Sequence, residues 1–205
     1  MAAKQAIAEA GGRSSDDERT DIERPLRADA RRNRERLVAA ARDVFAEQGV
    51  SASMEAIARK AGVGVGTLYR HFPTRLDVVE AVYEEDVQEL TDAAQRAVST
   101  LEPLPAVEAF FDSFLSYAQT KKTLLTELRQ AFEKNPAMRS RNRERIDGSF
   151  DLVIERAKQA GVVRNDVNGS DITQLVSPIC TNESLSTEQT RRLMGMILDG
   201  LRATS

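Results

Sequence analysis

Residues 53–76 constrain the fold of this chain more than any other stretch, because two short amphipathic helical patterns stand there on either side of a glycine turn. Between 54 and 61 the apolar residues recur at the i, i+3, i+4, i+7 spacing of one helix face, and residues 65–72 repeat that spacing. Gly62 and Gly64, between the two patterns, are of the residue type that ends a helix and permits a tight turn. The stretch therefore predicts a helix-turn-helix.

The charge distribution singles out the same part of the chain. Residues 31–75 hold nine Lys and Arg against four Asp and Glu, whereas residues 76–205 hold 15 against 21 and the whole chain carries a net charge of −3. A basic segment in an acidic protein is the electrostatic footprint of phosphate binding, although an ordinary solvated basic surface gives similar counts. Because this segment contains the helix-turn-helix, we favour double-stranded DNA as the partner.

The residues of the motif resemble those of a known family. Ile57-Ala58 and Ala61-Gly62-Val63, followed by the run from Gly66-Thr67-Leu68-Tyr69 to His71-Phe72-Pro73, are similar to the DNA-binding domain of the TetR (tetracycline-repressor-like) transcriptional regulators. The similarity covers residues 33–80. It implies an all-α fold of about nine helices, in which an N-terminal three-helix helix-turn-helix DNA-binding domain precedes a helical ligand-binding and dimerisation domain.

The resemblance also implies roles for individual residues. The start of the second motif helix, Val65 to Thr67, is expected to face the groove, while Tyr69 and His71 are expected to contact phosphates. Arg75 stands where the family more often has a lysine, and its guanidinium keeps the charge for a phosphate contact. Arginines ahead of the motif either reach the DNA or only solubilise the start of their helix. The DNA-binding candidates are Arg31, Arg32, Arg34, Ser53, Val65, Gly66, Thr67, Tyr69, Arg70, His71 and Arg75.

Several of these candidates have a structural alternative. Ser53 is expected to cap the first motif helix. Gly66 costs its helix about 1 kcal/mol relative to alanine, so either DNA approaches its backbone closely or the preceding helix packs against it. Tyr69 shares the apolar pattern of its helix and His71 stands beside Phe72, so partial burial competes with phosphate contact at both.

The chain divides into three expected parts. Residues 1–27 are polar and without sustained periodicity, which predicts a disordered or frayed tail. Residues 28–75 form the expected helix-turn-helix domain, and residues 76–205 read as successive helices without an alternating strand pattern. By resemblance, the last two helices, at about 170–181 and 187–203, pair with those of a second subunit in a homodimer.

Aromatic residues in the third part either line a ligand pocket or fill the core. TetR-like proteins generally keep an inducer cavity among these helices, which implies a small apolar ligand but does not choose its contacts. The arginines at 139, 141, 143 and 145 recur at a spacing of two and so spread around their helix, which predicts a solvated surface. The ligand-binding candidates are Phe110, Phe114, Tyr117, Phe132 and Phe150.

Several other kinds of site find no support. One cysteine, Cys180, and one histidine, His71, cannot supply the ligands of a structural zinc site, so we expect neither a metal nor a cofactor. There is no nucleophile–base pair and no phosphate-binding loop. The apolar runs are too short to span a membrane and nothing marks the N-terminus for export, so we expect a cytoplasmic location.

Together these observations favour a homodimeric transcriptional regulator that acts as a repressor. Two heads would enter successive major grooves of a partly palindromic operator, and a ligand in the helical body would release the DNA. The competing hypothesis is an all-helical small-molecule carrier or enzyme in which the helix-turn-helix is only packing. A second rival is an architectural or activating DNA binder that has no ligand.

Overall fold

In the computed structural model, residues 15–203 are described, with side chains described from Asp29 onward except that of Val50. Over this range the chain is all-α, as expected, with nine α-helices, a three-residue 3-10 helix after the first of them, and no strand. The helices are α1 (Ser15–Gln48), α2 (Met54–Ala61), α3 (Val65–His71), α4 (Arg75–Thr100), α5 (Pro103–Thr123), α6 (Leu125–Lys134), α7 (Pro136–Gln159), α8 (Gly169–Thr181) and α9 (Thr187–Leu201).

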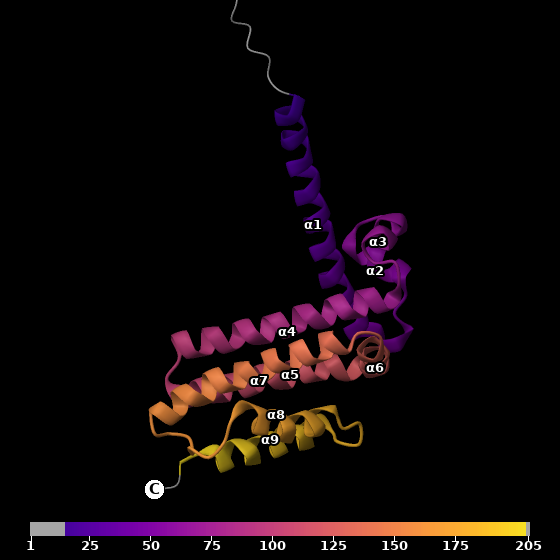
Figure 1. The fold of residues 1–205 in the computed structure, drawn as a ribbon. Coiled ribbons are helices and arrows are strands. Elements are labelled where there is room, and N and C mark those ends of the chain that lie inside the picture. Colours follow the sequence, from indigo (N-terminus) through magenta and orange to yellow (C-terminus); the bar gives the residue numbers. More distant parts are fainter. Residues whose placement is uncertain (1–14, 204–205) are drawn as a thin grey trace, which may run out of the picture.

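The helices form a small head on a larger body (Figure 1). The head consists of α2, α3 and the part of α1 that packs on them, and it lies over one end of the body. The long helices α4, α5 and α7 run side by side along the body, with α4 beginning at the head. Helices α8 and α9 form a further layer on the side of the body away from the head, and α6 closes the end beneath it.

Some of the expected helix boundaries were wrong. Helix α1 begins at Ser15 rather than Ala28, so residues 15–27 of the expected tail are helical, while residues 1–14 lie outside the described part. Residues 15–27 are mostly polar residues that tolerate a helix but form no apolar stripe, so hydrophobic periodicity does not predict a helix there. Helix α8 begins one residue earlier than expected, because Asn168 is its N-cap and accepts a hydrogen bond from the Asp171 amide at 2.9 Å.

The cap at Ser53 and the helix end at Gly62 are present as expected, and the next helix has a cap at Thr74. The Ser53 hydroxyl accepts a hydrogen bond from the Ala56 amide at 3.1 Å and so begins α2. Gly62 ends α2 in the left-handed conformation, with φ of 67°, where a side chain would be strained. Thr74 and Asp77 form a reciprocal capping box that begins α4. These local contacts fix where each helix of the motif starts and stops.

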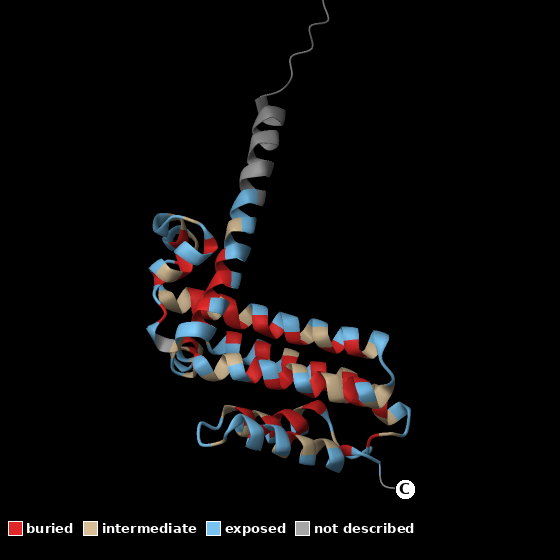
Figure 2. Ribbon diagram, turned by 180° about the vertical axis from the view of Figure 1, so that it is seen from behind, coloured by how far each residue is buried: buried red, intermediate tan, exposed pale blue. Residues whose placement is uncertain are grey.

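Buried residues lie along the long helices of the body (Figure 2), and where α5 and α7 meet this core is aromatic. Phe110 and Phe114 of α5 both pack edge-to-face on Phe150 of α7, with ring centroids 4.8 and 5.1 Å apart. All three rings are at most 1% exposed. Rings of this size dominate the apolar area that a core removes from water, so this cluster is a major source of the body's stability.

The layer of α8 and α9 docks on the body through a close contact between backbones. The Gly169 amide donates a hydrogen bond to the Asp151 carboxylate at 2.6 Å. A Cβ atom at Gly169 would lie 2.2 Å from the carbonyl oxygen of Asp147 and 2.7 Å from the Asp151 nitrogen. Only glycine therefore lets the start of α8 approach α7 this closely.

The variant Gly169→Ala is expected to destabilise the protein by about 1–3 kcal/mol, because the added methyl group meets backbone atoms that cannot move aside cheaply. Denaturant unfolding followed by circular dichroism measures this change. The control is Gly148→Ala on α7, where a Cβ meets no described atom within 4 Å, and this change is expected to raise stability by about 0.5–1 kcal/mol. Equal stability of the Gly169→Ala variant and the parent would contradict the close contact.

Candidate nucleic-acid interface and ligand pocket

One face of α3 is held in the head and the other is exposed. Leu68 of α3 and Phe72 after it are 0% and 2% exposed, whereas Val65 and Tyr69 are 38% and 43% exposed. The apolar pattern of 65, 68, 69 and 72 therefore does not form one buried stripe, and Tyr69 is partly buried rather than enclosed in the core. Helix α3 has only seven residues and about two turns, so Val65 and Tyr69 lie at the edge of its buried face and remain partly exposed.

Three candidates form a polar cluster on the exposed face of α3. The Arg70 guanidinium folds back along the helix and donates to the Gly66 carbonyl and to the Thr67 hydroxyl, each at 3.3 Å. A Cβ built at Gly66 meets no atom of the described residues within 4 Å, so packing against the preceding helix does not explain this glycine. The backbone at Gly66 is open, with a guanidinium group beside it.

The arginines of α1 divide into two kinds. The Arg34 guanidinium lies 4.7 Å from the centroid of the Phe72 ring, and Arg36 donates to the Ala61 carbonyl at 2.5 Å, so both tie α1 to the motif. Arg31 and Arg32 are exposed and pair within α1, with Glu35 and Asp29 respectively. Pairs this exposed are weak and are easily exchanged for phosphate contacts.

Arg75 does not lie on the exposed face of α3 but in the junction between the head and the body. Its guanidinium donates to the Ala52 carbonyl, pairs with Glu127 of α6 at 3.1 Å, and lies 5.0 Å from the centroid of the Phe45 ring. Its side chain is 27% exposed and that of Glu127 13%. The expected phosphate contact of Arg75 would have to compete with these partners.

A second ion pair joins the same two parts of the molecule. Arg42 of α1 lies 2.7 Å from Asp86 and 2.6 Å from Glu89, both on α4. Burial raises the pKa of Asp86 to about 6, against the opposing effect of the Arg42 charge. Because Arg42 also contacts Glu89, the contact between α1 and α4 does not depend on Asp86 alone.

The two remaining DNA-binding candidates, Ser53 and His71, also make contacts within the protein. Ser53 is exposed, but its hydroxyl serves as the cap of α2. His71 is half-buried, with its ring centroid 6.5 Å from that of Phe72. The structure brings Val65, Gly66, Tyr69 and Arg70, which are exposed, and the half-buried Thr67 together on one surface, which we call the α3 face.

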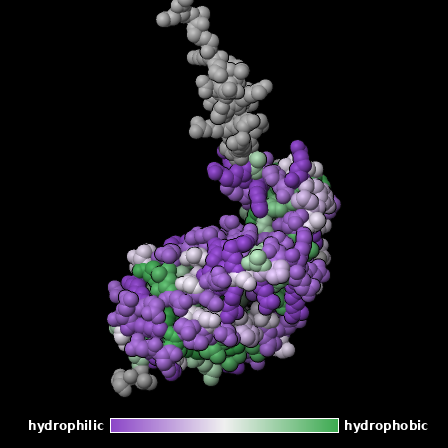
Figure 3. Space-filling model, in the orientation of Figure 1, coloured by the Kyte–Doolittle hydropathy of each residue, from purple (hydrophilic) through white to green (hydrophobic). Residues whose placement is uncertain are grey.

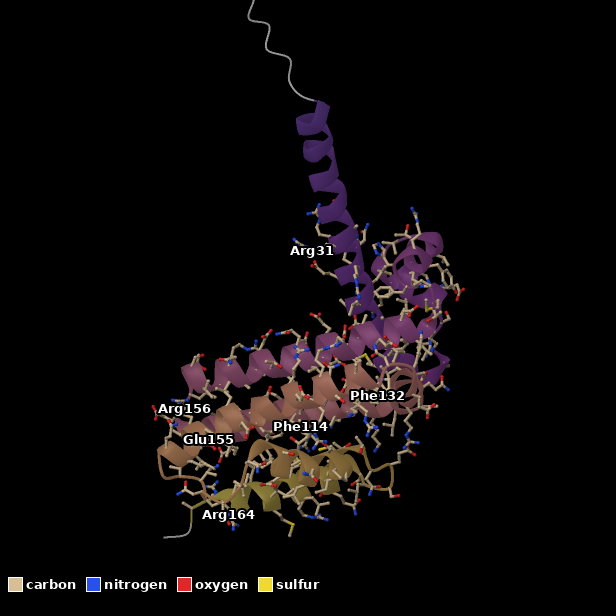
Figure 4. The ribbon with its side chains drawn as sticks, in the orientation of Figure 1. Arg31, Phe114, Phe132, Glu155, Arg156 and Arg164 are labelled. Carbon is tan, nitrogen blue, oxygen red and sulfur yellow. The ribbon has the colours of Figure 1, made fainter. Side chains whose placement is uncertain are left out.

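A cavity of about 740 Å³ opens between α4, α5, α6, α7 and α8. Of the five aromatic candidates, Phe114, Tyr117 and Phe132 line this cavity. Phe132 lies at the end of the body beneath the head, and Phe114 lies further along (Figure 4). Phe110 and Phe150 do not line it; they pack on each other in the core between α5 and α7, which is the alternative that the sequence left open for them.

The basic lining of the cavity was not expected from the sequence. Arg139 and Arg143 are one helical turn apart and both line it, whereas Arg141 and Arg145 lie on another face of α7 and contact Glu84 and Gln88 of α4. Arg139 is exposed and the side chain of Arg143 is 42% exposed, so the expectation of a solvated arginine surface holds even where it borders the cavity. The i, i+4 spacing predicts that Arg139 and Arg143 share one face of the helix and that Arg141 and Arg145 share another. It does not predict that one of these faces borders a cavity.

Two other kinds of site find no support in the part of the chain that the structure describes. Among residues 15–203, no helix is long and apolar enough to cross a membrane. Over the same residues, no three His, Cys, Asp or Glu side chains are grouped so that they could hold a metal ion.

Known proteins resemble both parts of this chain. The family model described as bacterial regulatory proteins, tetR family, matches residues 37–82, and that of the C-terminal domain of SbtR-like transcriptional regulators matches residues 102–203. The crystal structure of the TetR transcriptional regulator SCO0520 from Streptomyces coelicolor is 35% identical, with a TM-score of 0.73 over 84% of this chain and 99% of that one.

Two further relatives extend this picture. A TetR transcription regulatory protein from Mycobacterium vanbaalenii is 33% identical, with a TM-score of 0.69 over 87% of this chain and 100% of that one. The HTH-type transcriptional regulator UidR of Escherichia coli K12 is 26% identical over 158 residues, which are 74% of this chain and 79% of UidR.

The open backbone at Gly66 gives a test of the α3 face. We expect Gly66→Ala to leave the protein as stable or to stabilise it by up to about 1 kcal/mol, because the methyl group meets no described atom. The same variant should bind duplex DNA about tenfold or more weakly, because the methyl group occupies the space of the approaching DNA. Thermal unfolding and fluorescence anisotropy with labelled duplex measure the two effects, and unchanged DNA affinity would contradict a close approach at this position.

Proposed function

This chain belongs to the TetR family of bacterial transcriptional regulators, and on that premise we propose that it is a ligand-responsive repressor that binds a partly palindromic operator as a homodimer. DNA binding and regulation of transcription follow from membership of the family. The relatives reported above are named as transcriptional regulators and not as carriers or enzymes, which leaves the carrier or enzyme hypothesis without support. The observation that carries the proposal is the exposed α3 face, with its polar groups and open backbone.

The α3 face offers few side-chain donors to base edges. Thr67, Tyr69 and Arg70 carry polar groups, while Val65 offers a methyl surface and Gly66 only backbone. Arg70 is the one group of the α3 face with a bidentate donor geometry suited to guanine or to a phosphate. We therefore propose that a few direct contacts from Thr67 and Arg70, together with the shape of the DNA, decide the sequence preference.

We place the dimer contact on the outer surface of α8 and α9. Leu175 of α8 is 57% exposed and Met196 of α9 is 65% exposed. Figure 3 shows hydrophobic surface gathered along the edge of the body that these two helices form. Apolar side chains that exposed are suited to pairing with the same helices of a second copy about a two-fold axis. Two heads held this way could occupy half-sites about 34 Å apart, one turn of DNA.

Helix α6 provides a physical route from the cavity to the head. Arg129 and Phe132 of α6 line the cavity, and Glu127 of the same helix pairs with Arg75 at the start of α4. A ligand that displaces α6 would therefore move Glu127 and change its ion pair with Arg75, which joins the head to the body. Release of DNA requires that the ligand bind the DNA-incompetent arrangement more tightly than the competent one. A repressor acting in this way on chromosomal DNA works in the cytoplasm.

The DNA-binding assignment is tested by removing single groups from the α3 face. We expect Arg70→Ala to weaken binding to random duplex and to reduce the slope of log affinity against log salt by about one, because one phosphate contact is lost. Tyr69→Phe removes only a hydroxyl and should weaken binding by about 0.5–1.5 kcal/mol. Anisotropy titrations at several salt concentrations measure both effects.

The matched control is Arg96→Ala, which removes an exposed arginine from the end of α4 that lies away from the head. This variant should bind DNA as the parent does. If the Arg70→Ala and Arg96→Ala variants have the same affinity and the same salt slope as the parent, the α3 face is not the DNA contact.

A further inference from the structure

The cavity between α4 and α8 has one apolar part and one strongly basic part. Phe114, Phe132 and Ile146 supply apolar surface. Against these stand four cations and one carboxylate among the lining residues: Lys121, Arg129, Arg139, Arg143 and Glu133. The cavity therefore departs from the expectation of a purely apolar ligand.

Lys121 is the most informative of these cations. It is largely buried, and its ammonium lies 5.8 Å from the Tyr83 ring centroid and 5.9 Å from that of Tyr117. No carboxylate among the described residues pairs with it. Burial, reinforced by the charges of Arg143 and Arg139, lowers its pKa. A charge in this position is costly unless an anion joins it.

The Tyr117 hydroxyl is a second polar group without full hydrogen bonding. The side chain of Tyr117 is 7% exposed and lines the cavity. Its hydroxyl lies near that of Tyr83, yet it forms no hydrogen bond of ordinary geometry with any described residue. Burial raises the pKa of Tyr117 well above its usual value, so the group stays protonated and can donate.

The positive charge of the cavity is not cancelled by its neighbours. Arg143 pairs with Asp147 at 3.0 Å, and Glu133 can offset one further cation. Even with both carboxylates set against one cation each, two cations remain. Arg139 lies 6.0 Å from the centroid of the Phe132 ring, so the basic part and the apolar part are adjacent.

We propose that this cavity takes an organic anion whose carboxylate or similar acidic group lies between Lys121, Arg139 and the Tyr117 hydroxyl, with an apolar or aromatic portion against Phe114 and Phe132. This inference rests on the proposed function only in treating the cavity as the inducer site. Charge-assisted hydrogen bonds to the acidic group are the strongest contacts that such a site offers. The aromatic walls bind the rest of the molecule through area and edge contacts.

Two fluorescent probes that differ only in an acidic group separate the contribution of charge to binding in the cavity from the contribution of apolar contact. 8-Anilinonaphthalene-1-sulfonate carries a sulfonate, and N-phenyl-1-naphthylamine has the same ring system without it. The full-length protein should bind the sulfonate more tightly than the neutral probe. Lys121→Met and Arg139→Gln should each weaken binding of the sulfonate by about 10-fold to 100-fold and change binding of the neutral probe by less than about threefold.

The control variant is Arg141→Gln, which removes an arginine from the other face of the same helix, where it pairs with Glu84. It should leave both probes bound as in the parent, and thermal unfolding of all three variants shows whether they are folded. The proposal is overturned if the folded Lys121→Met and Arg139→Gln variants bind the sulfonate as the parent does, or if both probes lose affinity equally.

The same probes distinguish this inference from the proposed function. Duplex binding is measured separately, with and without saturating sulfonate. Charge-dependent binding of the sulfonate without any change in DNA affinity supports the anion site and counts against ligand response. A loss of DNA affinity that both probes cause equally, and that Lys121→Met does not alter, supports ligand response and overturns the anion site.

Discussion

The guanidinium group of Arg75 is the contact on which the relation between the head and the body depends. It joins the carbonyl of Ala52 and the ring of Phe45, both in the head, to Glu127 on α6. Because the side chains of Arg75 and Glu127 are both largely buried, loss of Arg75 would leave the Glu127 carboxylate without this ion pair. The ion pairs of Arg42 with α4 join the same two parts of the molecule. Buried apolar residues of α1 and α4 belong to one continuous core, so the position of α3 relative to the body depends on these charged contacts together with apolar packing.

This junction and the cavity share helix α6. Glu127 faces the head, while Arg129 and Phe132 line the cavity only a few residues further on. A helix of ten residues moves largely as a unit, so a ligand that shifts Phe132 or Arg129 in the cavity would also displace Glu127. Under the proposed function, this shared helix is the route by which a ligand in the cavity changes the position of the head.

Much of the fold could be predicted from the sequence because it is decided by local contacts. Ser53, Gly62 and Thr74 set the ends of the motif helices through partners at most four residues away. Glu127, the carboxylate that pairs with Arg75, is 52 residues distant from it, and no pattern in the sequence connects the two. The rotation of α5 decides that Phe114 faces the cavity while Phe110 faces the core, and spacing alone cannot show that rotation. The α3 face was largely predictable, whereas the basic lining of the cavity was not.

In the proposed function, two copies of this chain present two α3 faces to one piece of DNA. Selection of bound sequences from a random duplex pool, with the stoichiometry of the selected complex measured by analytical ultracentrifugation, tests this arrangement. We expect an inverted repeat with half-site centres about 10 base pairs apart and an even number of chains on each duplex. A single unrepeated site bound by one chain, or no enriched sequence at all, would contradict it.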